Sequence, residues 1–203
     1  MPHSGVAERN AAGAAYNPNP GQLWGLSMAL KNRTAWLAAV LLGFAMAGPS
    51  AAVQQGDMAP AWHARDFGGH PVDFPAMLQG KPAVVVFWAT WCPYCKAFMP
   101  YLKNIQADYA KQGVKVVVIN AKEDGRGDPA AYVQSLGFAP IAIANGDDVA
   151  KAYDIQYIPG LLIVDAAGKV AYRRPWTDLP AGKTVAELWD GQVRTALDAL
   201  LRR

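Results

Sequence analysis

The sequence predicts an α/β protein in which a mixed central β-sheet is flanked by helices. Residues 83–88 form a continuous apolar run and residues 115–120 contain four consecutive apolar residues, a composition typical of strands buried on both faces of a sheet. The segment at 96–111 carries apolar side chains at helical spacing, which predicts a strand, helix, strand unit with a right-handed crossover. Residues 161–173 read as two strands joined by a tight turn, so antiparallel strands are expected as well.

Residues 1–52 are expected to lie outside the folded domain, which we place at residues 53–203. Residues 1–27 are rich in Ala, Gly, Asn and Pro without apolar periodicity, which is typical of a disordered extension, and Met28 is the expected start. Basic residues then precede an apolar run at 35–47 and small residues, the pattern of a secretory signal peptide. This run is shorter than the roughly 20 residues of a membrane span, so we expect cleavage and export, with an uncleaved N-terminal anchor as the alternative.

The composition is that of one globular domain. Hydrophobic residues make up 52% of the 203-residue chain, enough for a full core. The formal net charge is +3, and the basic residues are scattered along the sequence. We therefore expect no nucleic-acid partner.

The folded domain is expected to open with a β-hairpin. Residues 59–66 and 70–74 read as two short strands around a pair of glycines, and we interpret them as an N-terminal extension of the sheet. His63 and His70 lie in this hairpin, where we expect them to have no catalytic role. The buried strand at 83–88 follows as the central strand.

The helix at 96–111 is expected to kink at Pro100. After the strand at 115–120, Asp128 and Pro129 form an N-cap and first-turn pair for a helix that ends at residue 136. The remaining expected elements are a strand at 139–144, a helix at 147–153, a hairpin of strands 161–164 and 170–173, and an amphipathic helix at 184–201 with Val185, Leu188, Val193, Leu197 and Leu200 facing inward.

The two cysteines of the chain, Cys92 and Cys95, form a C-x-x-C motif between the strand at 83–88 and the following helix. The free amide groups and the positive dipole end of a helix start favour a thiolate at this place. The histidines do not supply a second pair of ligands at the spacing of a zinc site. A purely structural disulfide would close too short a loop to add much stability. The motif therefore indicates a thiol redox centre.

Two separated motifs carry a resemblance to a known family. The chain reads VVVFWATWCPYCK at residues 84–96, with Pro100 in the following helix, and YDIQYIPGLLIV at residues 153–164. Together they resemble thioredoxin. Residues 80–82, Gly-Lys-Pro, and the stretch FWATWCP resemble more closely the periplasmic TlpA/ResA/DsbE type of thioredoxin-like reductase. The resemblance covers residue 57 to the C-terminus, and it implies the thioredoxin fold.

The resemblance implies a role for each residue of the cysteine motif. Cys92, at the exposed start of the helix, is expected to be the attacking nucleophile. Cys95, one helical turn further on and more buried, is expected to attack the mixed disulfide and release the substrate. Pro93 and Tyr94 are expected to shape the turn and tune its redox poise. No cofactor beyond this dithiol and no metal is expected.

Three further residues are expected to bind substrate. Pro159 matches the cis-proline of thioredoxins, so the Ile158–Pro159 bond is expected to be cis and to lie against the cysteine turn. The backbone before it would then pair with an extended substrate peptide. Trp91, beside the nucleophile, is expected to be an exposed apolar platform, whereas Trp88 is expected in the core.

Two positions depart from the family pattern. Thioredoxin has a buried acid at the position of Val86, and ResA-like proteins have a glutamate at the position of Phe98. Cys95 is therefore expected in an apolar pocket that raises the pKa of its thiol. The group that accepts its proton stays open, with Glu123 as one candidate.

The resemblance implies an exported, periplasmic thiol:disulfide oxidoreductase that reduces protein disulfides. Its expected partners are protein thiol or disulfide substrates and a membrane-embedded thiol electron donor, in cytochrome c maturation or a related assembly. A thiol-based metallochaperone of the same fold is one alternative, for which only Met99 offers a further soft ligand close by. A peroxiredoxin-like peroxidase is another, but its T-x-x-C spacing is not met by Thr90 and Cys92.

Overall fold

The computed structural model describes residues 52–175, 182 and 184–202. They belong to the second of two units into which the chain divides, Ala51–Arg203. The expected N-terminal extension and signal peptide lie outside the described residues. None of the helices in the described ranges is long and apolar enough to cross a membrane.

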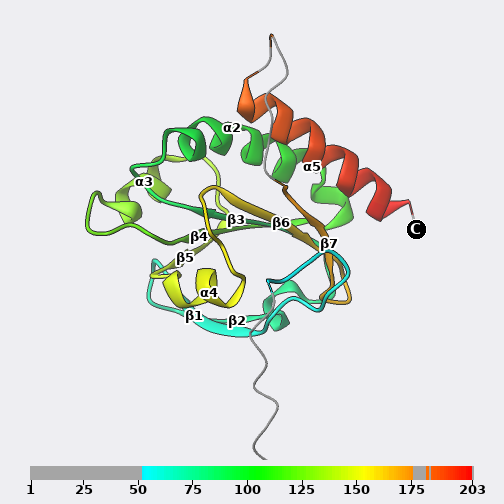
Figure 1. The fold of residues 1–203 in the computed structure, drawn as a ribbon, viewed down its shortest axis with the longest axis horizontal. Coiled ribbons are helices and arrows are strands. Elements are labelled where there is room, and N and C mark those ends of the chain that lie inside the picture. Colours follow the sequence, from blue (N-terminus) through cyan, green and yellow to red (C-terminus); the bar gives the residue numbers. More distant parts are fainter. Residues whose placement is uncertain (1–51, 176–181, 183, 203) are drawn as a thin grey trace, which may run out of the picture. The chain divides into compact units, whose positions relative to one another are not determined.

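A seven-stranded sheet organises the described domain, in the order β2-β1-β5-β4-β3-β6-β7 (Figure 1). The strands are β1 (Trp62–Asp66), β2 (Pro71–Phe74), β3 (Ala83–Trp88), β4 (Lys115–Asn120), β5 (Ile141–Ala144), β6 (Gly160–Val164) and β7 (Val170–Arg173). Neighbours among β3, β4 and β5 run parallel, whereas β1 with β2, β1 with β5, β3 with β6 and β6 with β7 are antiparallel. The mixed sheet and both expected hairpins are confirmed.

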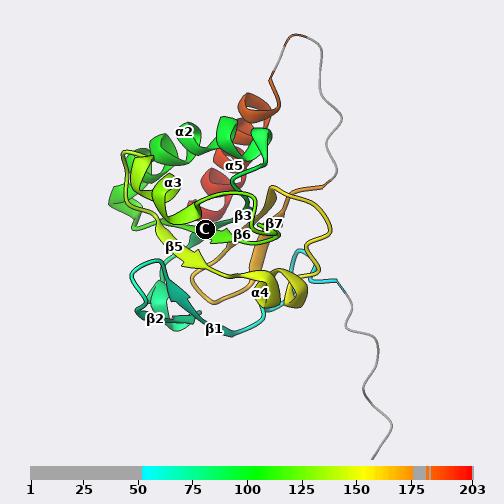
Figure 2. The same cartoon turned by 90° about the vertical axis from the view of Figure 1, so that its left-hand side faces the viewer.

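Helices cover both faces of this sheet. In the described ranges they are α2 (Pro93–Asp108), α3 (Pro129–Ser135), α4 (Asp147–Ala152) and α5 (Val185–Leu201), with 3-10 turns η2 (Ala76–Leu78) and η3 (Ala110–Gln112). Figure 1 shows α2 and α5 over one face and α4 near the other, and Figure 2 gives the same layers from the side. Along β3, Val84, Val86 and Trp88 pack with α2 and α5. The alternate residues pack with α4 and the hairpin β1–β2, so β3 is buried on both faces as expected.

Helix α2 begins three residues earlier than expected, at Pro93. The Cys92 side chain caps it by accepting a hydrogen bond from the Cys95 N–H, and Pro93 suits the first turn because its missing N–H needs no partner there. The helix continues through Pro100 and ends at Asp108, after which the chain forms the 3-10 turn η3. The cysteine turn is therefore part of a regular helix start.

The inward face of α5 differs from the expectation. Val193 and Leu197 are buried as expected, together with Ala186 and Trp189. By contrast, Val185, Leu188 and Leu200 are only partly buried. The observed stripe includes Trp189, whose ring lies edge-on against Phe98 of α2 at a centroid distance of 5.7 Å. Val185 and Leu200 nevertheless pack against the same core cluster from its edge.

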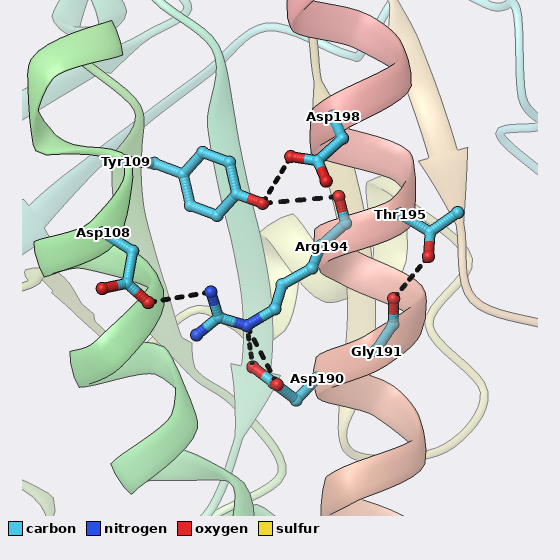
Figure 3. A network of polar contacts seen from close by, with 7 residues as sticks. All are labelled: Asp108, Tyr109, Asp190, Gly191, Arg194, Thr195 and Asp198. Atoms are coloured by element: carbon cyan, nitrogen blue, oxygen red, sulfur yellow. Dashed lines mark hydrogen bonds and ion pairs between the residues drawn. The ribbon is translucent and has the colours of Figure 1, made fainter.

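A polar network joins α2 to α5 at the far end of α2 (Figure 3). The Arg194 guanidinium donates to Asp190 on its own helix, at 2.9 Å, and to Asp108 on α2, at 2.8 Å. The Tyr109 hydroxyl donates to Asp198 at 2.7 Å. The two helices are thus held together by polar side chains beside their apolar contact.

The start of β7 is paired on its free side with the chain that precedes β1. The Gly56 N–H donates to the Val170 carbonyl at 2.8 Å, and the Val170 N–H donates to the Asp57 carbonyl at 2.9 Å. Met58 forms an antiparallel bridge with Lys169. These bonds occupy the sheet edge at the turn of the C-terminal hairpin.

Candidate redox site

Cys92 and Cys95 are joined by a disulfide bond at the start of α2. Cys92 is the N-cap residue, and its sulfur accepts a hydrogen bond from the Cys95 N–H at 3.1 Å. The donor and the helix dipole both favour negative charge on the Cys92 sulfur once the disulfide is reduced. The strand β3, the turn and the helix therefore build a site for a reactive thiolate.

The expected exposure of Cys92 is wrong in this disulfide state. Cys92 is only 2% exposed and Cys95 only 1%, because both belong to the core between α2, α5 and the sheet. The exposed neighbours are Trp91, at 39%, and Tyr94, at 58%. A partner therefore meets an aromatic rim before it meets sulfur.

Trp91 and Trp88 occupy the places expected for them. Trp88 is fully buried, whereas Trp91 lies at the surface with its indole N–H bonded to the Lys122 carbonyl at 2.6 Å. The Arg126 guanidinium covers the Trp91 ring at 4.9 Å from its centroid, in a cation–π contact. The platform is thus fixed by the loop at residues 121–128, of which the sequence analysis named only Glu123 as a site candidate.

Glu123 of the same loop anchors the turn before the cysteines. Its carboxylate accepts hydrogen bonds from the Thr90 N–H at 2.9 Å, from the Thr90 hydroxyl and from the Asn120 amide at 2.7 Å. Burial raises the pKa of Glu123, but these bonds and the charge of Lys96 outweigh it, so this pKa lies below its ordinary value. Gly127 lets the loop approach, since a Cβ there would collide with the Thr90 hydroxyl.

The contact between Glu123 and Thr90 could have been predicted from the parallel pairing of β3 and β4. Trp88 pairs with Asn120 at the ends of β3 and β4. Residues just beyond both ends therefore meet at one edge of the sheet, which places Glu123 beside Thr90.

The Ile158–Pro159 bond is cis, as predicted. Both residues line a cavity of about 300 Å³ together with Tyr94 of the cysteine turn. Its other lining residues are Tyr157, Arg174, Val185 and Trp189. The structure therefore brings the two sequence motifs together, and it adds Arg174, which the sequence analysis missed because nothing in the local pattern distinguishes it from a surface arginine.

The two positions that lack an acid are confirmed as apolar core. Val86 is 1% exposed and Phe98 is fully buried, and both share one core cluster with Cys95. Cys95 therefore lies among apolar side chains, an environment that disfavours a thiolate.

The remaining candidates lie away from this chemistry. His63 and His70 are exposed on the N-terminal hairpin and bond to Asp73 at 2.6 Å and Asp66 at 3.0 Å. Met99 is buried in the core at 2% exposure. Within the described ranges, no group of three or more His, Cys, Asp or Glu side chains could hold a metal ion.

The chain is similar to one protein family and to several known proteins. The Redoxin family matches residues 54–187 of this chain. The thiol-disulfide oxidoreductase ResA of Geobacillus kaustophilus is 32% identical over 120 residues, which cover 59% of this chain and 68% of that protein. A solved thiol:disulfide interchange protein of the thioredoxin family from Chlorobium tepidum TLS is 26% identical, with a TM-score of 0.54, covering 72% of this chain and 99% of that one.

A secreted Mycobacterium tuberculosis disulfide oxidoreductase homologous to E. coli DsbE is also 26% identical, with a TM-score of 0.50, covering 66% of this chain and 95% of that one. The family match spans more than half of the chain and contains the cysteine turn, the Glu123 loop and the cis-proline. With this sheet order and these relatives, the chain belongs to the Redoxin family, as a thioredoxin-like protein of the TlpA/ResA/DsbE type.

Proposed function

We propose that this protein is a periplasmic thiol:disulfide oxidoreductase that reduces disulfides in proteins through Cys92 and Cys95. The observation that carries the proposal is the Cys92–Cys95 pair at the N-terminus of α2, next to the cavity that Tyr94, Ile158 and Pro159 line. The names of the relatives support thiol–disulfide chemistry in general. The direction of reduction and the periplasmic location rest on the resemblance and the leader pattern of the sequence.

In the reduced protein, the Cys92 thiolate attacks one sulfur of a substrate disulfide. A Cys92–substrate disulfide forms, and the first substrate sulfur leaves as a thiolate that takes up a proton. The Cys95 thiolate, after losing its proton, then attacks the Cys92 sulfur, which closes the Cys92–Cys95 disulfide and releases the second substrate thiolate. Two electrons pass to the substrate in all. A membrane-embedded dithiol would restore the reduced pair by the same exchange in reverse.

The rim of the site suits an extended peptide. Among the described residues, no hydrogen bond engages the main-chain groups of Ile158, so they are available to pair with a substrate strand. The exposed rings of Trp91, Tyr94 and Tyr157 offer apolar contact around that strand. We propose that the substrates include proteins that need free thiols for assembly, such as those of cytochrome c maturation.

The two alternatives find less support in the site. The Thr90 hydroxyl is bonded to Glu123, so it is engaged in holding the turn rather than presented to a peroxide. A copper or zinc chaperone would need a further soft ligand at the surface, but Met99 lies in the core.

Reduction of insulin by the domain at residues 53–203, with dithiothreitol as electron source, tests the proposed function. Wild-type protein is expected to accelerate the reaction, Cys92→Ser to abolish the acceleration, and Cys95→Ser to accumulate mixed disulfides, because the resolving thiol is missing. A zinc and copper titration of Cys92→Ser serves as the parallel assay for metal binding. A wild-type protein that leaves insulin oxidised, or a Cys95 that is alkylated before Cys92 at mildly acidic pH, would contradict the assignment.

A further inference from the structure

Two consecutive arginines at the end of β7 hold opposite ends of the connection between α4 and β6. Arg173 donates to the carbonyls of Tyr153 and Asp154, each at 2.9 Å, where α4 ends. Arg174 donates through Nη2 to the Pro159 carbonyl, directly before β6. Successive residues of a strand point to opposite faces, which lets neighbouring side chains reach the two ends.

Arg174 is the buried member of this pair. Only 6% of it is exposed, and its main-chain N–H extends the pairing with β6 by donating to the Leu161 carbonyl at 2.9 Å. Its guanidinium lies 4.6 Å from the Trp189 ring centroid and 5.0 Å from that of Tyr157. One side chain thus links β7, α5 and the connection that carries Ile158.

These contacts use the planar shape of arginine. A guanidinium can face two aromatic rings while its edge donates to a carbonyl, whereas a lysine ammonium offers a point charge without a flat face. Burying such a cation is unfavourable unless it is engaged, so the contacts also disfavour other positions of the Pro159 carbonyl. The main chain at Ile158 is therefore held ready beside the cysteine turn before a substrate arrives.

We propose that Arg174 is a positioning residue for peptide substrates, which acts through Pro159 to hold the main chain of Ile158 for pairing with the strand that carries the substrate disulfide. The inference rests on the proposed function and deepens it. The effect of Arg174 should depend on the substrate, because a disulfide without peptide groups has no strand that could pair with the main chain of Ile158. Arg174 should then matter for peptide disulfides and be nearly irrelevant to small ones.

The test compares two oxidants of the reduced protein by stopped-flow tryptophan fluorescence. One is a short peptide closed by a disulfide, and the other is bis(2-hydroxyethyl) disulfide, which has no peptide group. Arg174→Gln is expected to lower the second-order rate constant for the peptide roughly tenfold or more, because a misplacement of about 1 Å at a reacting centre can cost about 100-fold. The rate constant for the small disulfide should change less than about twofold on the same reasoning.

Arg173→Gln is the matched control. It removes the adjacent guanidinium and two similar carbonyl contacts, but at the α4 end of the connection. It should leave the ratio of the two rate constants unchanged. Arg174→Lys keeps a donor without the flat face, so it should give an intermediate ratio, and it carries the test if the glutamine variant does not fold. The reduction potential should stay at the wild-type value, because Arg174 has no contact with sulfur among its described interactions.

The outcomes separate this inference from the function on which it rests. If wild-type protein reduces neither disulfide, the proposed function fails. If wild-type protein reduces both and the Arg174 variants slow both equally, Arg174 is a structural residue and the inference is wrong. An equal change of ratio in Arg173→Gln, or an unchanged ratio in both Arg174 variants, would overturn it as well.

Discussion

At the scale of single residues, Glu123 is the carboxylate bonded to the turn that precedes the cysteines. It accepts three hydrogen bonds from Thr90 and Asn120, and its pKa lies below the ordinary value. A carboxylate stabilised in its charged form is a weak base. We therefore expect Glu123 to hold the turn rather than to take the proton of Cys95.

The pH dependence of stability tests this role. The folded-state pKa of Glu123 is lowered, so its contribution is present above the ordinary pKa of 4.5 and is lost as pH falls through the folded-state value. Glu123→Gln should destabilise the protein near pH 7, and the difference from wild type should shrink below about pH 4.5. Urea unfolding of both proteins between about pH 3 and 7 measures it. A difference that is constant over this range would show that the charge of Glu123 is not involved.

Phe98 gives a second prediction at this scale. Its ring is fully buried between Tyr101 and Trp189, with centroid distances of 6.3 and 5.7 Å. Phe98→Glu should destabilise the protein by about 3–5 kcal/mol, the usual cost of removing a buried ring, and by more while the carboxylate is charged. In folded Phe98→Glu protein, the rate of release of the mixed disulfide should depend less on pH between about 6 and 9 than in wild type, because a base then lies near Cys95. Phe98→Leu is the apolar control, and equal pH profiles for both variants would contradict the argument.

At the scale of elements, the contact between α2 and α5 positions one side of the cavity beside the cysteine turn. Trp189 belongs to α5 but lines the cavity beside Pro159 and receives the Arg174 guanidinium. The network of Figure 3 holds the same two helices together further along. The cavity beside Pro159 is therefore shaped partly by a helix that is distant in sequence from both cysteines.

Tyr109 allows the strength of this contact to be measured. Burial and the bond to Asp198 raise its pKa from 10.0 to about 12. A raised folded-state pKa adds stability that is present below pH 10 and is lost as pH rises toward 12. Tyr109→Phe should cost about 0.5–1.5 kcal/mol near pH 7, the usual contribution of one hydrogen bond, and should reduce the loss of stability above pH 10. Denaturant unfolding at neutral and alkaline pH compares the two proteins.

The comparison must be made as a difference, because burial also raises the pKa of Tyr132, Tyr153 and Tyr172. Asp198→Asn is the matched control, since it keeps an acceptor for the Tyr109 hydroxyl and removes the charge. If Tyr109→Phe has wild-type stability at both pH values, the bond between α2 and α5 contributes nothing.

At the scale of the whole molecule, local patterns predicted the elements and long-range contacts decided the site. Only neighbouring residues determine the apolar runs of β3 and β4 and the Asp128 cap of α3, so these features were predicted. The burial of Cys92, the inward turn of Trp189 and the contact of Arg174 with Pro159 each need a partner from another element. No periodicity carries that information, so these features could be found only in three dimensions.

The two outer strands of the sheet bear on how such a protein avoids self-association. β2 and β7 have four residues each, and β2 begins with Pro71 and carries Asp73, which disfavour the addition of a further strand. β7 is already bonded to Gly56 and Asp57. The short outer strands, the residues Pro71 and Asp73 of β2 and the bonds at Val170 of β7 therefore disfavour pairing of this sheet with a strand of a second copy.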